Sequence, residues 1–142
     1  MTRVMASGVF DIIHTGHISY LEQAKSMGDE LVVVVACDAT VRRKKHEPVT
    51  PEEMRARIVG ALKPVDRAIV GNDGDMYETL RMVKPDIIVL GFDQKFDAAG
   101  LEAEIAKRGL GDIRVVRADE CADDLNATRR IIAKIRGRGD LQ

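Results

Sequence analysis

Two histidines stand three residues apart in the stretch SGVFDIIHTGH, residues 7–17, close to the start of the chain. A histidine side chain titrates at about pH 6.5 and donates a hydrogen bond from a ring nitrogen, so His14 and His17 could bind phosphate oxygens and stabilise negative charge that develops on them. Gly8 and Gly16 lack a Cβ, which lets backbone N–H groups approach an anion closely. The stretch therefore indicates electrostatic catalysis on a phosphate group, without a covalent intermediate.

The histidine pair could also serve a metal or the packing of the protein. Histidines at this spacing could form half of a metal site, although no cysteine or third histidine is suitably spaced to complete it. The imidazoles could instead fill space and bind the backbone. The glycine-rich phosphate loops G-x-x-x-x-G-K-[ST] and G-x-G-x-x-G are both absent, so phosphate binding at this position has to use the histidines.

Length and composition predict a single domain over residues 1–142. The 22 basic and 23 acidic residues nearly cancel, so the overall charge indicates neither nucleic-acid nor membrane binding, and any anion site must be local. No apolar run reaches the roughly 18 residues that span a bilayer, and no signal peptide is recognisable, so we expect a cytoplasmic protein. Cys37 and Cys121 have neither metal-ligand spacing nor a disulfide framework.

Five apolar, β-branched runs alternate with segments of helical pattern. The runs cover residues 3–7, 30–36, 67–70, 86–90 and 112–116. Runs that are apolar on both faces and separated by helices are typical of a buried parallel sheet, so we predict an open, doubly wound α/β fold. In such sheets ligands bind beyond the carboxyl ends of the strands. Functional residues should therefore follow the strands, at 8–17, 37–47, 71–76, 91–97 and 117–129.

A helix is predicted after Thr50, where the order Thr-Pro-Glu-Glu is typical of a helix start. Thr50 should cap this helix and Glu53 should complete a capping box. Met54 and Ile58 lie one turn apart and should both face the core.

The stretch Gly-Val-Phe-Asp-Ile-Ile-His-Thr-Gly-His, residues 8–17, resembles the G-x-F-D-x-x-H-x-G-H signature of the cytidylyltransferase-like nucleotidyltransferases. The resemblance implies a Rossmann-like sheet of five strands in the order 3-2-1-4-5. It also implies that His14 and His17 stabilise the transition state when a substrate phosphate attacks the α-phosphorus of a nucleoside triphosphate and releases pyrophosphate. The other nucleotide-binding positions of the signature match Gly8, Val9, Phe10, Thr15 and Gly16.

Lysines after the second strand help to hold phosphates in this family. The matching loop reads Arg-Arg-Lys-Lys at residues 42–45, and Lys44 is the first candidate for this catalytic role, with Lys45 second. Four consecutive cations could also form a solvated loop. Asp11, Asp38 and Arg55 match further family positions and are candidates for binding the acceptor, with Asp11 alternatively close to a metal ion or a lysine.

The segment GFDQKFD, residues 91–97, follows the fourth strand and should face the same crevice. Asp93 can accept hydrogen bonds from ribose hydroxyls or a base amine. Phe92 and Phe96 could stack on a base or an isoalloxazine, whereas Phe10 could stack there or fill the floor of the site. The G-x-D-Q pattern resembles archaeal-type FAD synthetases, while the cytidylyltransferases typically carry a tryptophan here, which favours ATP and FMN as substrates.

The family's last phosphate-binding element precedes the final helix, which we predict at about residues 127–136. Thr128 and Arg129 match it, although Ala127 replaces an expected hydroxyl. The resemblance further implies a divalent cation, Mg²⁺, and a homodimer. Two alternatives remain: a cytidylyltransferase that uses CTP with glycerol 3-phosphate or another phosphorylated alcohol or sugar, and a non-catalytic nucleotide-binding module that regulates a partner.

Overall fold

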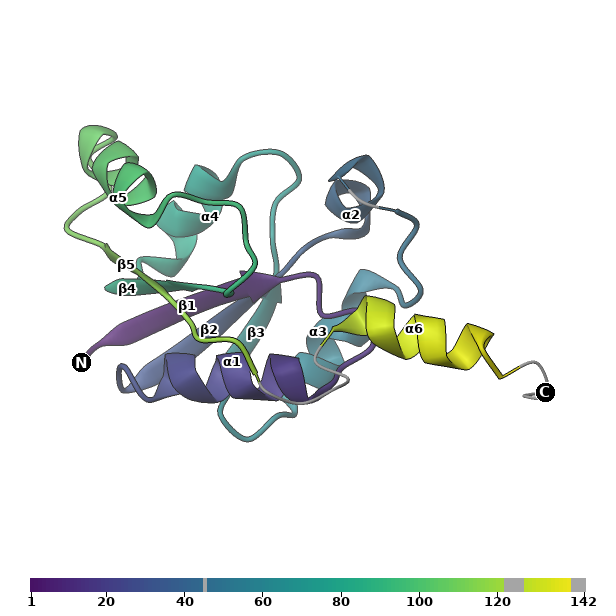
Figure 1. Ribbon diagram of the computed structural model, residues 1–142. Coiled ribbons are helices and arrows are strands. Elements are labelled where there is room, and N and C mark those ends of the chain that lie inside the picture. Colours follow the sequence, from purple (N-terminus) through teal and green to yellow (C-terminus); the bar gives the residue numbers. More distant parts are fainter. Residues whose placement is uncertain (45, 122–126, 139–142) are drawn as a thin grey trace.

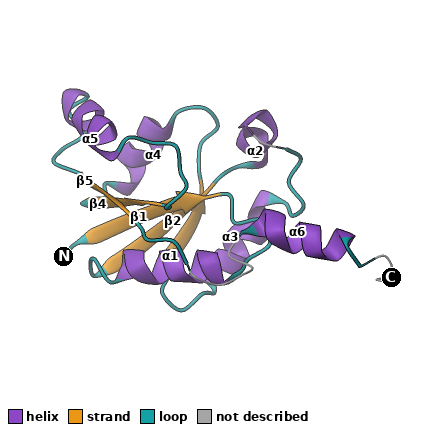
Figure 2. Cartoon of the chain, in the orientation of Figure 1, coloured by secondary structure: helices purple, strands orange, loops and turns teal. Residues whose placement is uncertain are grey.

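The computed structural model describes residues 1–44, 46–121 and 127–138. Five parallel strands form one sheet in the order β3-β2-β1-β4-β5, which confirms the predicted doubly wound α/β fold. The strands are β1 Arg3–Gly8, β2 Glu30–Val35, β3 Arg67–Val70, β4 Ile87–Leu90 and β5 Arg114–Arg117. The helices are α1 Thr15–Lys25, α2 Asp38–Lys44, α3 Glu52–Gly60, α4 Met76–Val83, α5 Ala98–Lys107 and α6 Thr128–Arg136. Helices α1 and α3 lie on one side of the sheet and α4 and α5 on the other (Figure 1; Figure 2).

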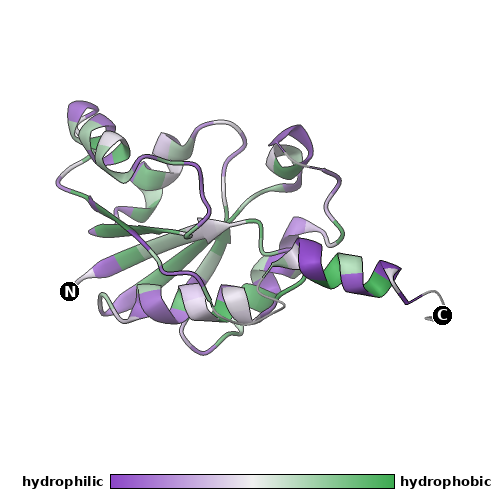
Figure 3. Cartoon of the chain, in the orientation of Figure 1, coloured by the Kyte–Doolittle hydropathy of each residue, from purple (hydrophilic) through white to green (hydrophobic). Residues whose placement is uncertain are grey.

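Strand β2 shows why the apolar runs have no polar face. Val33 and Val35 pack into the core between the sheet and helices α1 and α3, whereas Val32 and Val34 pack into the core beneath α4 and α5. Successive side chains of a strand point to opposite faces, so a strand that is covered by helices on both faces has to be apolar at every position. Hydrophobic residues accordingly gather along the strands and on the helix surfaces that face them (Figure 3).

The basic run after β2 is helical, although the sequence predicts a loop there. Residues 38–44 form α2, a short helix with Asp38 in its first turn and basic residues in its last turn. This distribution of charge suits the helix dipole. Val41 is the buried residue of α2, and its side chain anchors the helix to the protein. None of the helices in the described ranges is long and apolar enough to cross a lipid bilayer.

The predicted cap and apolar face of α3 are both wrong. Pro51 occupies the N-cap position and makes no side-chain capping bond, because the Thr50 hydroxyl donates to Asp11 Oδ1 at 2.7 Å instead. Met54 is 49% exposed, and the buried residues of the helix are Arg55 and Val59. The helix is therefore rotated so that a charged residue faces inwards, which its apolar periodicity does not indicate.

The hydroxyl of Tyr20 lies between β1 and β4, the two strands at which the strand order of the sheet reverses. The pairing of β1 with β2 continues to Gly8, but its pairing with β4 ends at Ala6 opposite Val89. Beyond that point Ser7 N donates to Tyr20 Oη at 3.1 Å, and Tyr20 Oη donates to the Val89 carbonyl at 2.5 Å. Burial raises the pKa of Tyr20, and the hydrogen bond with Ser7 opposes that rise only in part. The neutral hydroxyl thus satisfies both strands while it keeps them apart.

We predict that Tyr20→Phe lowers the free energy of unfolding by about 1–3 kcal/mol, because the Ser7 N–H and the Val89 carbonyl lose their shared partner. Tyr77→Phe is the matched control: Tyr77 is partly exposed and contacts Arg108 through its ring, so its substitution should change stability by less than about 0.5 kcal/mol. Urea denaturation of the two variants measures both effects. Equal losses would show that the Tyr20 hydroxyl has no special role.

Candidate active site

The candidate site residues come together at the carboxyl ends of the strands. The β1–α1 loop, helix α2 and the loop after β4 all lie at this end of the sheet, and α6 begins beside the β1–α1 loop (Figure 1). This is the edge at which doubly wound sheets bind ligands. The structure therefore brings together segments that are up to 117 residues apart, as the contact between Thr128 and Asp11 shows.

His14 and His17 form the N-terminal cap of α1. Gly16 N donates to His14 Nδ1 at 3.0 Å, and His14 N donates to His17 Nδ1 at 3.3 Å, which makes a reciprocal capping box from two imidazoles. The two ring centroids are 3.9 Å apart and the rings stack at 28°. Because each Nδ1 accepts a backbone N–H, each neutral ring carries its proton on Nε2. The cap therefore orients two Nε2–H donors at the start of one helix.

His14 is neutral near pH 7. Its ring is half-buried, and this desolvation lowers the pKa of His14 below the ordinary value. Protonation would also place a hydrogen on Nδ1, opposite the N–H of Gly16. A neutral imidazole that donates from Nε2 can bind an anionic oxygen without first losing its place at the helix cap.

The loop that leads to the histidines has an unusual backbone. Phe10 has φ = 56° and Ile12 has φ = 61°, a left-handed conformation that is costly for residues with a Cβ. The Phe10 ring is only 3% exposed and lies 5.2 Å from the ring of His17. Phe10 therefore forms the floor beneath the histidines, which was one of its two predicted roles, and is too buried to stack on a substrate ring.

Asp11 is buried, with only 4% of its surface exposed. Its side chain accepts hydrogen bonds from Val49 N at 2.7 Å, Thr50 N at 3.1 Å and Thr50 Oγ1 at 2.7 Å. Burial raises the pKa of this carboxyl, but the hydrogen bonds from Thr50 and Val49 and the charge of Arg55 outweigh it, so the pKa of Asp11 is lowered. Asp11 therefore holds residues 49–50 against the β1–α1 loop, a structural role that the sequence did not predict and that differs from the expected contact with an acceptor or a metal ion.

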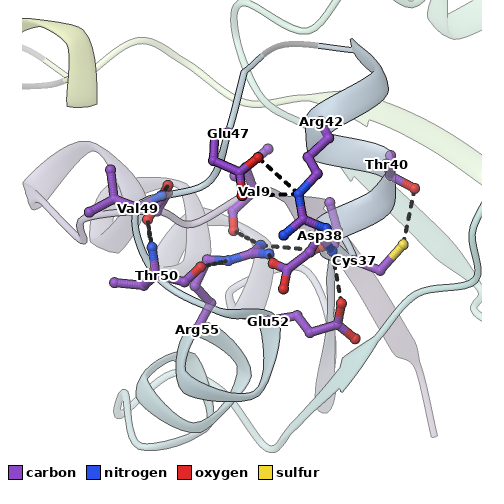
Figure 4. Close-up of polar contacts among 12 residues, drawn as sticks. Val9, Cys37, Asp38, Thr40, Arg42, Glu47, Val49, Thr50, Glu52 and Arg55 are labelled. Atoms are coloured by element: carbon purple, nitrogen blue, oxygen red, sulfur yellow. Dashed lines mark hydrogen bonds and ion pairs between the residues drawn. The ribbon is translucent and has the colours of Figure 1, made fainter.

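Arg55 is likewise buried, and its guanidinium joins several segments (Figure 4). It donates to the carbonyls of Val9 at 2.8 Å, Ala36 at 2.7 Å and Thr50 at 2.9 Å, and it forms an ion pair with Asp38 at 2.5 Å. The first two carbonyls follow the ends of β1 and β2. The guanidinium of Arg55 is fully buried in these contacts, which give it a supporting role, whereas the side chain of Asp38 is 19% exposed and pairs with Arg55 through Oδ1. The contact of either residue with the acceptor stays a prediction.

Helix α6 begins next to the same loop, and its observed range agrees with the predicted final helix. Thr128 Oγ1 donates to the Asp11 carbonyl at 2.8 Å, so its hydroxyl fixes the start of α6 to the β1–α1 loop. Ala127 occupies the N-cap position and provides no side-chain cap. Arg129 is exposed in the first turn of the helix. Thr128 thus begins α6 beside the β1–α1 loop, with Arg129 next to it in the chain. Their role as phosphate ligands stays a prediction.

Among the cations of α2, Lys44 is the one that the described structure leaves without an ion pair. Arg42 pairs with Glu47 at 2.9 Å, and Arg43 pairs with Asp73 at 2.5 Å. Lys44 is the exposed last residue of the helix. The second candidate, Lys45, lies outside the described residues. The ion pairs of its neighbours therefore favour Lys44 as the side chain that α2 offers to a phosphate.

The loop after β4 exposes the residues predicted to contact a substrate ring. Phe92 is 39% exposed and Phe96 is 41% exposed, and Asp93 between them is also exposed. The backbone of this loop is bound by Gln94 and Arg117, two residues for which the sequence predicted no such role. The sequence feature that could have identified Arg117 is its position at the carboxyl end of the fifth strand, within one of the ranges predicted to be functional.

The described side chains of the candidate site do not form a metal-binding cluster. Within the ranges that the structure describes, no three His, Cys, Asp or Glu side chains converge in a way that could hold an ion. The two histidines use their Nδ1 atoms as acceptors of backbone hydrogen bonds, and Asp11 already accepts three hydrogen bonds. This arrangement does not favour the interpretation of the histidine pair as half of a metal site.

Comparison with known proteins places these features in a family context. A model of the cytidylyltransferase-like family matches residues 5–132. The FAD synthase of Aciduliprofundum boonei is 56% identical over 141 residues, which cover 99% of this chain and 94% of the relative. The FAD synthase of Archaeoglobus profundus is 48% identical over 142 residues, which cover 97% of this chain and 91% of the relative.

A solved structure is also similar to this chain in sequence and in fold. The crystal structure of a protein from Thermoplasma volcanium, described as a lipopolysaccharide core biosynthesis protein, has a TM-score of 0.83 and 53% identity. The match covers 85% of this chain and 98% of that one. A structure from Archaeoglobus fulgidus of unknown function, with a TM-score of 0.67 and 20% identity, shows the shared fold alone.

The capping geometry predicts different effects of two substitutions at His14. At pH 8, His14→Ala should lower the free energy of unfolding by about 1 kcal/mol, because the N–H of Gly16 loses its side-chain acceptor. His14→Asn keeps an acceptor oxygen at the N-cap and should stay within about 0.5 kcal/mol of the wild type. Urea denaturation followed by circular dichroism measures both. A cap role for His14 is contradicted if asparagine is as destabilising as alanine.

Stability should also depend on pH through His14. Because the folded state lowers the pKa of His14, the unfolded chain binds a proton at this ring first, and the free energy of unfolding falls as the pH decreases from 6.5 through the folded-state pKa. At higher pH the ring is neutral in the folded and the unfolded state, so it does not change the free energy of unfolding with pH. Urea midpoints between pH 8 and pH 5 should fall less for His14→Asn than for the wild type. Parallel curves for the two proteins would exclude this contribution.

Proposed function

We propose that this chain, which belongs to the cytidylyltransferase-like family, is an FAD synthase: it transfers the AMP moiety of ATP to the phosphate of FMN and releases pyrophosphate. The observation that carries the proposal is the 56% identity to the FAD synthase of Aciduliprofundum boonei across 99% of this chain. The histidine pair at the carboxyl end of β1 supports it, because nucleotidyl transfer requires donors to phosphate oxygens and no protein nucleophile.

The reaction is an in-line substitution at phosphorus. An oxygen of the FMN phosphate attacks the α-phosphorus of ATP, a new P–O bond forms, and the bond to the bridging oxygen of pyrophosphate breaks. Negative charge grows on the oxygens around the α-phosphorus and on the leaving group. The Nε2–H of His17 binds the α-phosphate, and that of His14 binds the β-phosphate or the bridging oxygen. Both donors are oriented in advance by the α1 cap, so little reorganisation is needed during the reaction.

The surrounding residues bind the rest of the substrates. Backbone groups of the segments 8–10 and 15–16 contact the phosphates at the start of α1, where the helix dipole favours negative charge. Lys44 and Arg129 hold the departing pyrophosphate, and Thr128 fixes the start of α6 beside it. Asp93 accepts hydrogen bonds from the adenosine, and Phe92 and Phe96 offer faces on which an aromatic ring can stack.

A magnesium ion is best regarded as part of the substrate. The described residues provide no cluster of acidic side chains or histidines for a metal, whereas a triphosphate binds Mg²⁺ through its own oxygens. When bound, the ion neutralises part of the triphosphate charge. The protein's contribution is to bind that complex through Lys44, Arg129 and the two imidazoles.

A sugar phosphate is the second candidate acceptor. The similar protein of Thermoplasma volcanium is described by a role in the biosynthesis of lipopolysaccharide, a molecule that contains sugars. The same histidine chemistry would serve that acceptor, since only the nucleophilic phosphate changes. The identity to FAD synthases favours FMN as the acceptor, and the exposed phenylalanines of the loop after β4 suit a flat ring, which ATP and FMN both carry.

The proposed function predicts that the purified protein, supplied with ATP, Mg²⁺ and FMN, forms FAD and pyrophosphate. Pyrophosphate release should be measured over a matrix of ATP or CTP with FMN, glycerol 3-phosphate or a hexose phosphate, and FAD should be identified by chromatography. Turnover confined to another pair would reassign the substrates. Binding of ATP without turnover of any acceptor would instead support a regulatory module.

Substitutions at the histidines should slow the reaction without unfolding the protein. We expect His17→Ala and His14→Asn each to lower kcat by about 10²–10³-fold, because one donor to the developing charge is removed. Turnover by Lys44→Met should also be lower. Lys63 is an exposed lysine that precedes β3 at the opposite end of the sheet, so Lys63→Met is the control and should turn over as fast as the wild type. A folded His17→Ala protein with wild-type turnover would contradict the mechanism.

A further inference from the structure

The loop at residues 91–97 is bound from one side by a single guanidinium. Arg117, the last residue of β5, donates from Nη1 to the carbonyls of Gly91 at 3.0 Å and Gln94 at 2.7 Å, and from Nη2 to the carbonyl of Phe96. Three carbonyls that are spread over six residues of the loop thus converge on one side chain. A planar guanidinium with five N–H groups can satisfy them together, which a lysine ammonium on its flexible stem cannot do with the same geometry.

Gln94 fixes the same loop from within. Gly91 N donates to Gln94 Oε1 at 2.7 Å, and Gln94 Nε2 donates to the Ser7 carbonyl at the end of β1 at 3.4 Å. Gln94 N also donates to the Gly91 carbonyl at 3.2 Å, which closes a turn. The loop is therefore attached to β1 through Gln94 and to β5 through Arg117, on the two sides of β4.

These attachments use the backbone of the loop and leave most of its side chains in solvent. Phe92 and Phe96 are 39% and 41% exposed, and Asp93 and Lys95 are exposed as well. Exposed phenylalanines are poorly solvated and gain by contact with a flat ring. A loop whose backbone is fixed while its aromatic and acidic side chains face solvent has the character of a preorganised binding surface.

We propose that Arg117 is a positioning residue for substrate recognition: it holds the backbone of residues 91–97 so that Phe92, Asp93 and Phe96 receive a planar, fused heteroaromatic ring that carries an N–H donor. This inference rests on the proposed function, in which both substrates have such a ring, the adenine of ATP and the isoalloxazine of FMN. Arg117 acts through the loop and makes no contact with the reacting phosphates. Its loss should weaken binding of one substrate and leave the histidine chemistry unchanged.

The test uses Arg117→Met and Arg117→Lys in steady-state assays that vary ATP and FMN separately. We expect the KM for one of the two substrates to rise by about tenfold in both variants, because the loop must now be ordered on binding. The kcat should stay within about twofold of the wild type. The substrate whose KM rises identifies the ring that the loop binds. Arg114→Met, at the other end of β5, is the matched control and should leave both KM values unchanged.

Hydrogen exchange provides a readout that does not depend on the identity of the substrates. The amides of Gly91 and Gln94 donate within the loop, and they should exchange about tenfold faster in Arg117→Met than in the wild type, while amides of β4 keep their protection. Faster exchange with no FAD formation by the wild type would refute the proposed function while supporting the anchoring of the loop by Arg117.

Four results would overturn the proposal. Unchanged exchange at residues 91–97 would show that Arg117 does not hold the loop. A fall in kcat at unchanged KM would place Arg117 in the chemical step, and full rescue by Arg117→Lys would show that charge alone matters. An equal rise in both KM values together with a lower melting temperature would indicate general destabilisation.

Discussion

The buried guanidinium of Arg55 is the contact on which the shape of the site depends. It lies beneath the carboxyl ends of β1 and β2 and binds the carbonyls of Val9 and Ala36 and the carboxylate of Asp38. A buried cation that loses its partners destabilises a protein by several kcal/mol, so these segments have to stay where the guanidinium meets them. The ends of two strands and the beginning of α2 are thereby held in a fixed relation around a single side chain.

The β1–α1 loop is then fixed by contacts that extend from this centre. Arg55 also binds the Thr50 carbonyl, Thr50 donates to Asp11, and the carbonyl of Asp11 accepts from Thr128 at the start of α6. Together these hydrogen bonds offset the energetic cost of the left-handed backbone at Phe10. The strained loop ends in the histidine cap, so the buried polar groups support the two imidazoles without taking part in the chemistry.

Some features of the fold and the site could be predicted from the sequence and some could not. The apolar runs predicted five strands and their parallel arrangement, and the spacing of His14 and His17 after the first run indicated where the site would lie. The burial and internal hydrogen bonds of Asp11 and Arg55 were not predicted, because a carboxylate or guanidinium in a sequence pattern does not reveal whether it is buried. The helical conformation of α2 was missed because its basic run carries little apolar periodicity.

The sequence by itself determined two local properties of the chain: which runs are apolar on both faces, and which donors stand after the first strand. Only the tertiary structure decided which polar groups are supporting and which are available, since that depends on contacts between residues far apart in the chain. Arg117 and the Phe96 carbonyl are separated by 21 positions, and Tyr20 and the Val89 carbonyl by 69. Hydrogen bonds of this kind depend on distances in three dimensions, and neither residue type nor periodicity encodes those distances directly.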